Sequence, residues 1–240
     1  MKKLYIFSYG LYPGQITLET LAAMRQCGAV YTHCLDKATA GQFSKLAPGL
    51  KLNAGLNREE TARAAVSALA GHDTVGFLTY GNPLFLNQTA AEVMKAAAGK
   101  KAAVTVFAGV SSFDALVNLF NLNKYSPRGL RLVDAAASVD RPFFTPDMDT
   151  LIFVPDVLNL PENAARKKDF VAAALEAYPP TARVFLADCA SISGRSVKVV
   201  KGKISGLGAL LEKINERHTI FIPAVRKRFS GGERERASGL

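Results

Sequence analysis

Three short turns are the stretches of this chain best suited to chemistry. They are Gly10-Leu-Tyr-Pro-Gly14, Gly81-Asn-Pro-Leu-Phe85 and Ala108-Gly-Val-Ser-Ser112, and each follows an apolar run. Small residues let a ligand approach the backbone closely. Main-chain N–H and C=O groups at such turns can therefore bind an adenine, a ribose or a carboxylate without charged side chains. Short connections of this kind are also common in α/β folds, so on periodicity alone all three could be ordinary connections.

The turn at Gly81 organises the rest of the chain. An apolar run from Val75 ends at Tyr80, and Asn82 and Pro83 then suit the N-cap and the first position of a helix. The residue before a proline is pushed out of the α region, so the strand cannot continue smoothly into that helix. We expect backbone N–H groups to face the crevice at the carboxyl end of this strand, where open α/β sheets bind ligands.

The first half of the chain alternates strands and helices, which predicts a mainly parallel sheet with helices packed on it. His33 lies inside the second predicted strand, where a lone histidine is more often a core residue than a ligand. Ser111 and Asp114 have the spacing of a capping box, with Asp in place of Glu. The predicted strands are 4–9, 29–35, 75–80 and 102–107, and the predicted helices are 16–26, 41–46, 58–70, 83–98 and a last one that ends near residue 120.

The rhythm breaks over residues 121–148, where Asn, Pro, Gly and Asp are frequent, so we place a domain boundary within 121–126. The pattern predicts two α/β domains, a mainly parallel one over 1–121 and one with a mixed sheet over 122–226. Residues 227–240 are polar and basic, which predicts a disordered tail. The strands expected in the second domain are 130–137, 150–154, 182–188, 196–200 and 218–222, and the helices are 162–178 and 206–216.

Composition restricts the partners and the compartment. The 240 residues carry a formal net charge of +10, which could attract nucleic acid, an anionic small molecule or a membrane surface, or belong to an ordinary basic protein. The three cysteines, Cys27, Cys34 and Cys189, form no C-x-x-C pair, so we expect neither a disulfide framework nor a zinc site. The N-terminal apolar run is too short for a signal peptide, and no apolar stretch approaches the roughly 20 residues that span a bilayer. We expect a soluble, cytoplasmic protein.

Motifs of several enzyme classes are absent. The sequence has no G-x-x-x-x-G-K-[ST], no H-E-x-x-H and no G-x-S-x-G, and Gly10 and Gly14 do not complete G-x-G-x-x-G. The histidines are scattered at His33, His72 and His218, so we expect no metal site.

In order and separation, the three turns resemble the motifs of the tetrapyrrole methylase superfamily. Its G-x-G-P-G, G-D-P-x-x-F and P-G-V-S-S are similar to the turns that begin at Gly10, Gly81 and Ala108. The match extends over residues 3–224, because the segments beginning at Thr150, Ala182, Val199 and His218 fall where the family places later strands. The resemblance implies a two-domain α/β fold with the cofactor cleft between the domains, S-adenosylmethionine as cofactor, a methyltransferase activity and a homodimer.

The departures from these motifs point toward one branch of the superfamily. Asn82 replaces an acidic residue, Tyr12 a glycine and Ala108 a proline. Tyr80-Gly-Asn-Pro83 is similar to the Tyr-Gly-His-Pro of the borosin-type enzymes, which methylate peptide backbone nitrogens. Arg58 matches the arginine of that branch's catalytic set, whereas Ala62 stands where its tyrosine is expected.

The resemblance also implies the site residues. Tyr80 and Arg58 are the catalytic candidates, and the aromatic faces of Tyr80 and Phe85 suit a sulfonium. Tyr12, Pro13 and Gly14 are expected to shape the substrate cleft. The residues implied in cofactor binding are Tyr80, Gly81, Asn82, Leu84, Phe85, Val110, Ser111 and Ser112 from the first half, with Val154, Ala187 and Pro223 from the second.

Two kinds of methyl acceptor stay open. One is a tetrapyrrole-like small molecule, whose carboxylates would suit a basic protein. The other is a peptide, which would have to come from a separate precursor because the short tail lacks an apolar core peptide. A non-catalytic protein that binds anions or nucleic acid is the hypothesis from another class, but no nucleic-acid motif supports it.

Overall fold

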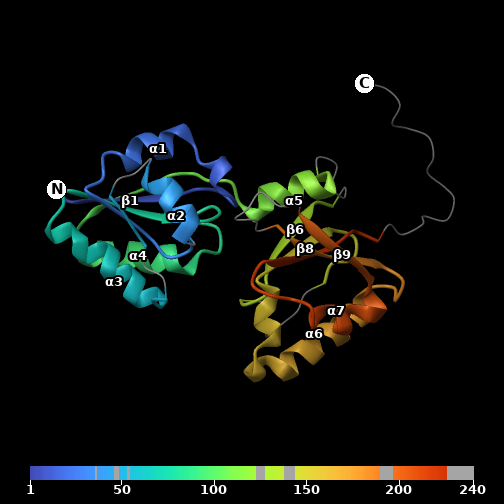
Figure 1. Cartoon of the computed structure of the whole chain (residues 1–240). Coiled ribbons are helices and arrows are strands. Elements are labelled where there is room, and N and C mark those ends of the chain that lie inside the picture. The colour runs from blue at the N-terminus through green and yellow to red at the C-terminus, as the bar shows by residue number, and fades with distance from the viewer. Residues whose placement is uncertain are drawn as a thin grey trace. The chain divides into compact units, whose positions relative to one another are not determined.

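The computed structural model describes residues 1–35, 37–45, 49–52, 55–122, 128–137, 144–189 and 197–225. The chain forms two compact units (Figure 1). Unit 1 consists of Met1–Leu122 with Cys189–Val197, and unit 2 of Asn123–Asp188 with Lys198–Leu240. The boundary predicted within 121–126 falls largely on residues outside the described ranges, as does the predicted tail at 227–240.

Unit 1 contains a five-stranded sheet in the order β3-β2-β4-β1-β5, with every pairing parallel. Its strands are β1 (Lys3–Ser8), β2 (Ala29–Thr32), β3 (Leu50–Leu52), β4 (Thr74–Thr79) and β5 (Ala103–Val106). The α-helices of this part of the chain are α1 (Leu18–Met24), α2 (Lys37–Ser44), α3 (Arg58–Ser67), α4 (Gln88–Gly99) and α5 (Ser112–Phe120), and its short 3-10 helices are η1 (Pro13–Gln15) and η2 (Ala68–Ala70).

The sheet of unit 1 is covered on both faces, as its apolar sequence requires. Side chains alternate along a strand, so Leu4 and Ile6 of β1 pack with α3 and α4, while Phe7 packs with α1 and α2 on the other face. Figure 1 shows α1 on one side of β1 and α3 and α4 on the other. Buried parallel strands of this kind place their carboxyl ends at one edge of the sheet.

Unit 2 contains a mixed sheet in the order β6-β7-β10-β8-β9. Only β6 (Leu130–Asp134) and β7 (Asp149–Phe153) pair in parallel, whereas β10 (His218–Ile222), β8 (Arg183–Asp188) and β9 (Lys198–Lys203) pair antiparallel with their neighbours. Its core lies against α6 (Ala164–Ala177) and α7 (Leu207–Leu211), which cover one face in Figure 1. The 3-10 helices are η4 (Pro155–Asn159), η5 (Pro161–Asn163) and η6 (Ile204–Gly206).

The predicted fold class, a parallel and a mixed α/β sheet, is confirmed. Several predicted boundaries were wrong. The helix expected from Pro83 begins at Gln88, the strand expected over 29–35 ends at Thr32, so that His33 lies beyond it, and the predictions lacked β3. The helix expected over 206–216 ends at Leu211, and the one expected over 41–46 begins at Lys37. None of the described helices combines the length and the apolar composition that crossing a membrane requires.

Candidate functional site

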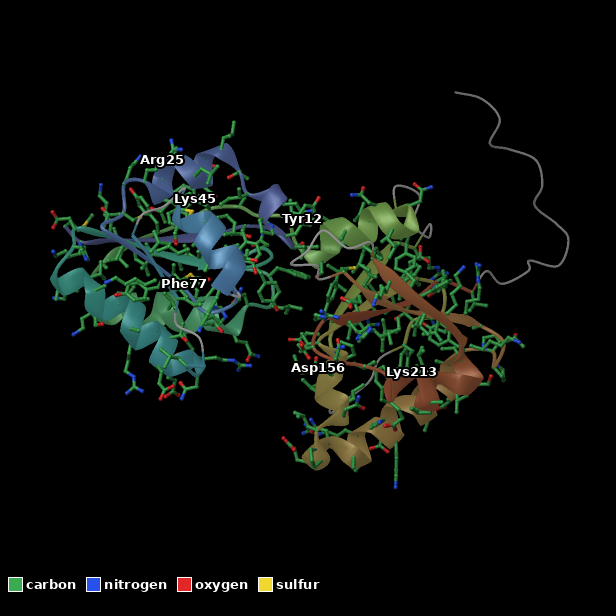
Figure 2. The ribbon with its side chains drawn as sticks, viewed as in Figure 1. Tyr12, Arg25, Lys45, Phe77, Asp156 and Lys213 are labelled. Atoms are coloured by element: carbon green, nitrogen blue, oxygen red, sulfur yellow. The ribbon has the colours of Figure 1, made fainter. Side chains whose placement is uncertain are left out.

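The three glycine-containing turns meet at one edge of the sheet of unit 1. They follow β1, β4 and β5, which are adjacent and parallel. The first two turns are joined through their main chains, because the Gly81 N–H donates to the Gly10 carbonyl oxygen at 2.9 Å. Figure 2 shows Tyr12, which lies in the first turn, at the opposite end of unit 1 from Arg25, which follows α1.

Gly10 and Gly109 allow the backbones at this edge to pack closely. Gly10 has φ +78°, and a Cβ there would lie 2.5 Å from the Gln15 Cβ. A Cβ on Gly109 would lie 2.3 Å from both the Cβ and the Oγ of Ser8 and 3.2 Å from the Gly81 carbonyl oxygen. The Ser8 hydroxyl in turn accepts a hydrogen bond from the Gly10 N–H at 2.8 Å. The first and third turns therefore pack through Ser8, and no larger residue fits at Gly109 without a shift.

Residues 80–86 form a folded loop, where a helix was expected to begin at Pro83. The Asn82 side chain does not cap a helix, because its Oδ1 accepts from the Leu84 N–H at 2.9 Å and closes a local turn. The Phe85 N–H donates to the Asn82 carbonyl oxygen at 3.0 Å, and the Phe85 ring lies 6.4 Å from that of Phe113 on α5. Leu86 then takes φ +54°, a left-handed conformation that separates the loop from the helical backbone of α4.

Gly81 is buried and yet borders open space. Its φ is +64°, and no heavy atom lies within 4 Å of the position that a Cβ would take. The N–H groups of Asn82, Gly109 and Val110 donate no hydrogen bond within the described part of the chain. These residues are only partly exposed. Partly exposed main-chain donors of the third turn thus lie close to Gly81, whose carbonyl oxygen is 3.2 Å from a Cβ position on Gly109.

Ser111 and Ser112 begin α5. The Asp114 carboxylate accepts from the Ser111 N–H at 2.7 Å and from the Ser111 hydroxyl at 2.8 Å, so the predicted reach of the acid back to Ser111 is confirmed. Ser111 is buried, and its hydroxyl hydrogen is already donated. Ser111 and Asp114 thus form a capping box at the start of α5.

Exposed apolar side chains surround this edge. Tyr80 is 46% exposed and Leu84 66%, both in the 80–86 loop. Arg58 is also exposed, at the first position of α3, where Asn57 and Glu60 form a capping box. Because α3 precedes the parallel strand β4, its first turn lies at the same edge. The other large apolar residues exposed in connections or first helical turns at this edge are Tyr12, Leu18, Leu56 and Leu86. Pro13 and Gly14 lie here too, in η1.

The residues implied in the second half do not all meet at one place. Val154 follows β7 and Ala187 lies near the end of β8, and both strands run antiparallel to β10. They therefore share one edge of the sheet of unit 2, where Val154 has φ +53°, a rare conformation for a β-branched residue. Pro223 follows the other end of β10, and the neighbouring Ala224 N–H bonds to Asp149 at the start of β7. Pro223 thus lies at the opposite edge of that sheet.

A partly buried thiol lies where three strands of unit 1 end. The Tyr9 hydroxyl donates to the Cys34 Sγ at 3.7 Å, and Thr32 Oγ1 lies 3.7 Å from the same sulfur. Burial raises the pKa of the Cys34 thiol, and hydrogen bonds from Tyr9, Thr32 and Thr79 offset only part of that effect. We infer that this thiol stays protonated and links the ends of β1, β2 and β4 without reacting.

His33 makes stability sensitive to pH. Its Nδ1 is buried and has no hydrogen-bond partner among the described residues, its ring stacks on Phe77 at 5.5 Å, and burial lowers its pKa below 6.5. Between the two pKa values the unfolded chain binds more protons than the folded one, so the free energy of unfolding falls as the pH drops below 6.5. Melting temperatures of His33→Phe should depend less on pH over this range, with His72→Gln as the control. Parallel curves for wild type and His33→Phe would contradict this role.

Comparison with known proteins identifies the family. Residues 3–207 match the family model of the Tetrapyrrole (Corrin/Porphyrin) Methylases. The chain belongs to this family. As a tetrapyrrole methylase it is an S-adenosylmethionine-dependent methyltransferase, so the predicted activity and cofactor are confirmed. No curated protein sequence matches it.

Solved structures share the fold of this tetrapyrrole methylase. Cobalt precorrin-4 methyltransferase CbiF matches at a TM-score of 0.64 and 14% identity, covering 92% of this chain and 94% of that one. The methyltransferase CobJ matches at a TM-score of 0.66 and 13% identity, covering 96% and 98%. Uroporphyrin-III C-methyltransferase from Thermus thermophilus, complexed with S-adenosylhomocysteine, matches at 0.62 and 16%, covering 92% and 97%. At these identities the likeness shows the fold alone.

The edge of unit 1 fits an adenosyl group. A Cβ on Gly81 would meet no heavy atom within 4 Å, and the N–H groups of Gly109 and Val110, which donate to no described residue, are of the kind that binds ring nitrogens or ribose oxygens. No charged side chain is needed for such contacts. Exposed Tyr80 and Leu84 lie in the same loop as Gly81.

Sequence reasoning missed three residues of this edge. Ser8 and Gln15 hold the first turn, since Gln15 Oε1 accepts from the Leu11 N–H at 2.7 Å. Asn87 caps α4, through Oδ1 and the Ala90 N–H at 3.0 Å. The sequence carries a signal for Asn87, a capping residue directly before the alanine-rich run, but the Asn82-Pro83 pair matches the pattern of a helix start more closely.

Proposed function

We propose that the enzyme methylates a tetrapyrrole-like acceptor, with its methyl donor bound at the carboxyl edge of β1, β4 and β5. The observation that carries the proposal is the open space beside the buried, left-handed Gly81, next to free main-chain donors. The exposed apolar rim supports an acceptor with a large flat apolar face. Family membership supports the same acceptor class.

Bound S-adenosylmethionine supplies a methyl group for in-line displacement, in which the acceptor's electron pair forms the new bond while the C–S bond breaks and leaves its electrons on sulfur. The chain's part is positioning, which supplies up to roughly 7–11 kcal/mol in model reactions. Tyr80 is exposed at this edge, and we propose that the face of its ring contacts the sulfonium. Such a cation–π contact contributes about 0.5–2 kcal/mol. We assign the guanidinium of Arg58 to carboxylates of the acceptor, which it can bind with two parallel hydrogen bonds.

Ala62 weighs against a peptide acceptor. It occupies the position where the catalytic tyrosine of the borosin-type branch is expected, and it is 3% exposed within the core between α3 and the sheet. A tyrosine would not fit there without repacking that core. We therefore favour the tetrapyrrole over a precursor peptide.

The test is a methylation assay with uroporphyrinogen III as the acceptor probe, read by mass spectrometry. We expect a product heavier by one methyl group or more, formed only in the presence of S-adenosylmethionine. Arg58→Gln should raise KM for this acceptor by about 10- to 100-fold, the loss of one charge-assisted contact, and leave the affinity for S-adenosylhomocysteine unchanged. Methylation of peptides but not of tetrapyrroles would overturn the proposed acceptor.

A further inference from the structure

We infer that Asn87 is a positioning residue for the methyl donor, because its side chain closes the 80–86 loop that presents Gly81. The inference rests on the proposed donor site. Asn87 lies at the far end of the loop, directly before α4, and Thr79 ends β4 at the near end. One side chain thus spans both ends of the segment whose shape determines the open space beside Gly81.

The contacts of Asn87 divide into two functions. Its Oδ1 accepts from the Ala90 N–H at 3.0 Å, which caps α4. Its Nδ2 donates to Thr79 Oγ1 at 2.9 Å and to the Tyr80 carbonyl oxygen at 3.4 Å, which ties the helix start to the end of β4. The first contact is local and stabilises the helix, whereas the other two act across seven and eight residues and hold the loop.

The loop needs such a tie because its backbone is strained at Leu86. Leu86 has φ +54°, and a left-handed non-glycine residue persists only where its surroundings hold it, whereas glycine adopts the φ of +64° at Gly81 without strain. Thr79, the anchor, is fully buried, so the tie attaches the loop to the rigid core of the sheet. Without the Nδ2 contacts, we expect Leu86 to relax and the main chain at Gly81 to lose its preorganised position.

Serine separates the two functions, because it caps helices about as well as asparagine but is too short to reach Thr79 and the Tyr80 carbonyl. We expect Asn87→Ala to lower the melting temperature and to weaken binding of S-adenosylhomocysteine, measured by calorimetry at 25 °C. Asn87→Ser should recover part of the melting temperature but not the affinity, with Kd raised about tenfold in both variants, as expected for two neutral hydrogen bonds. A stability loss alone leaves Kd and the binding stoichiometry unchanged while the protein stays folded.

Asn57→Ser is the matched control. Asn57 caps α3 in the same way, through Oδ1 and the Glu60 N–H at 2.9 Å, and its Nδ2 donates to none of the described residues. Its Kd should equal that of wild type. If Asn87→Ser binds S-adenosylhomocysteine like wild type while Gly81→Ala does not, the positioning role is wrong and the site stands. If both bind like wild type, the proposed site itself is wrong.

Discussion

Replacing Gly81 by alanine should weaken binding of S-adenosylhomocysteine by about 100-fold, which corresponds to roughly 2.8 kcal/mol. The added Cβ meets no protein atom within 4 Å, so it projects into the space that we assign to the ligand. Alanine at φ +64° also strains the folded backbone by about 1–2 kcal/mol. The measurement is calorimetric titration at a temperature where the variant is folded.

Gly55→Ala is the control that distinguishes backbone strain from a Cβ that blocks the ligand. Gly55 has φ +82° and likewise no heavy atom within 4 Å of a Cβ, but it lies in the exposed turn before α3. It should lose a similar amount of stability, seen in the melting temperature, and keep the wild-type affinity. If Gly81→Ala and Gly55→Ala bind S-adenosylhomocysteine with equal affinity, the ligand does not occupy the space beside Gly81.

Gly109→Ala should lower the melting temperature by roughly 6–12 °C, the effect of about 3 kcal/mol in a chain of this size. Its Cβ would lie 2.3 Å from the Cβ and Oγ of Ser8 and 3.2 Å from the Gly81 carbonyl oxygen. Relief of this clash moves Ser8, whose hydroxyl accepts from the Gly10 N–H, so the first turn is disturbed as well. Thermal unfolding followed by circular dichroism measures the loss.

The double variant Ser8→Gly/Gly109→Ala tests the stated cause. Ser8→Gly alone removes the acceptor of the Gly10 N–H and should cost about 1 kcal/mol. It also removes the atoms that the new Cβ meets, so the double variant should be more stable than the sum of the single losses by about 1 kcal/mol or more. Gly99→Ala, at the end of α4 with nothing within 4 Å, should leave the melting temperature nearly unchanged. Strict additivity at Ser8 and Gly109 would contradict direct contact.

Residue type and order were enough to predict the three turns and the parallel sheet, because both follow from local patterns. An apolar run, a glycine-containing turn and an amphipathic run repeat through unit 1, and such alternation leaves few folds open. The edge strand β3 could not be predicted this way. It has only three residues, and it forms through pairing with β2 from Val30 to Thr32.

The start of α4 shows how a local signal can mislead. Asn82-Pro83 reads as a helix start, but the Asn82 side chain closes a turn with Leu84 instead. The helix begins after Asn87, whose amide binds Thr79 eight residues earlier. A tertiary contact of this kind leaves no periodic trace in the sequence.

Pro223 shows a second limit. Hydrophobic runs predict that strands exist but not the direction in which they run. Because β10 is antiparallel to β7 and β8, Pro223 lies at the opposite edge of the sheet from Val154 and Ala187. Only the pairing of β10 with β7 and β8 shows that Pro223 does not share an edge with the other two residues implied by the resemblance.

The most direct test of the central claim is a crystal structure of the protein with S-adenosylhomocysteine. We predict that the adenosyl group lies against the main chain of Gly81 and accepts hydrogen bonds from the N–H groups of Gly109 or Val110. An adenosyl group bound away from the carboxyl edge of β1, β4 and β5 would contradict that claim.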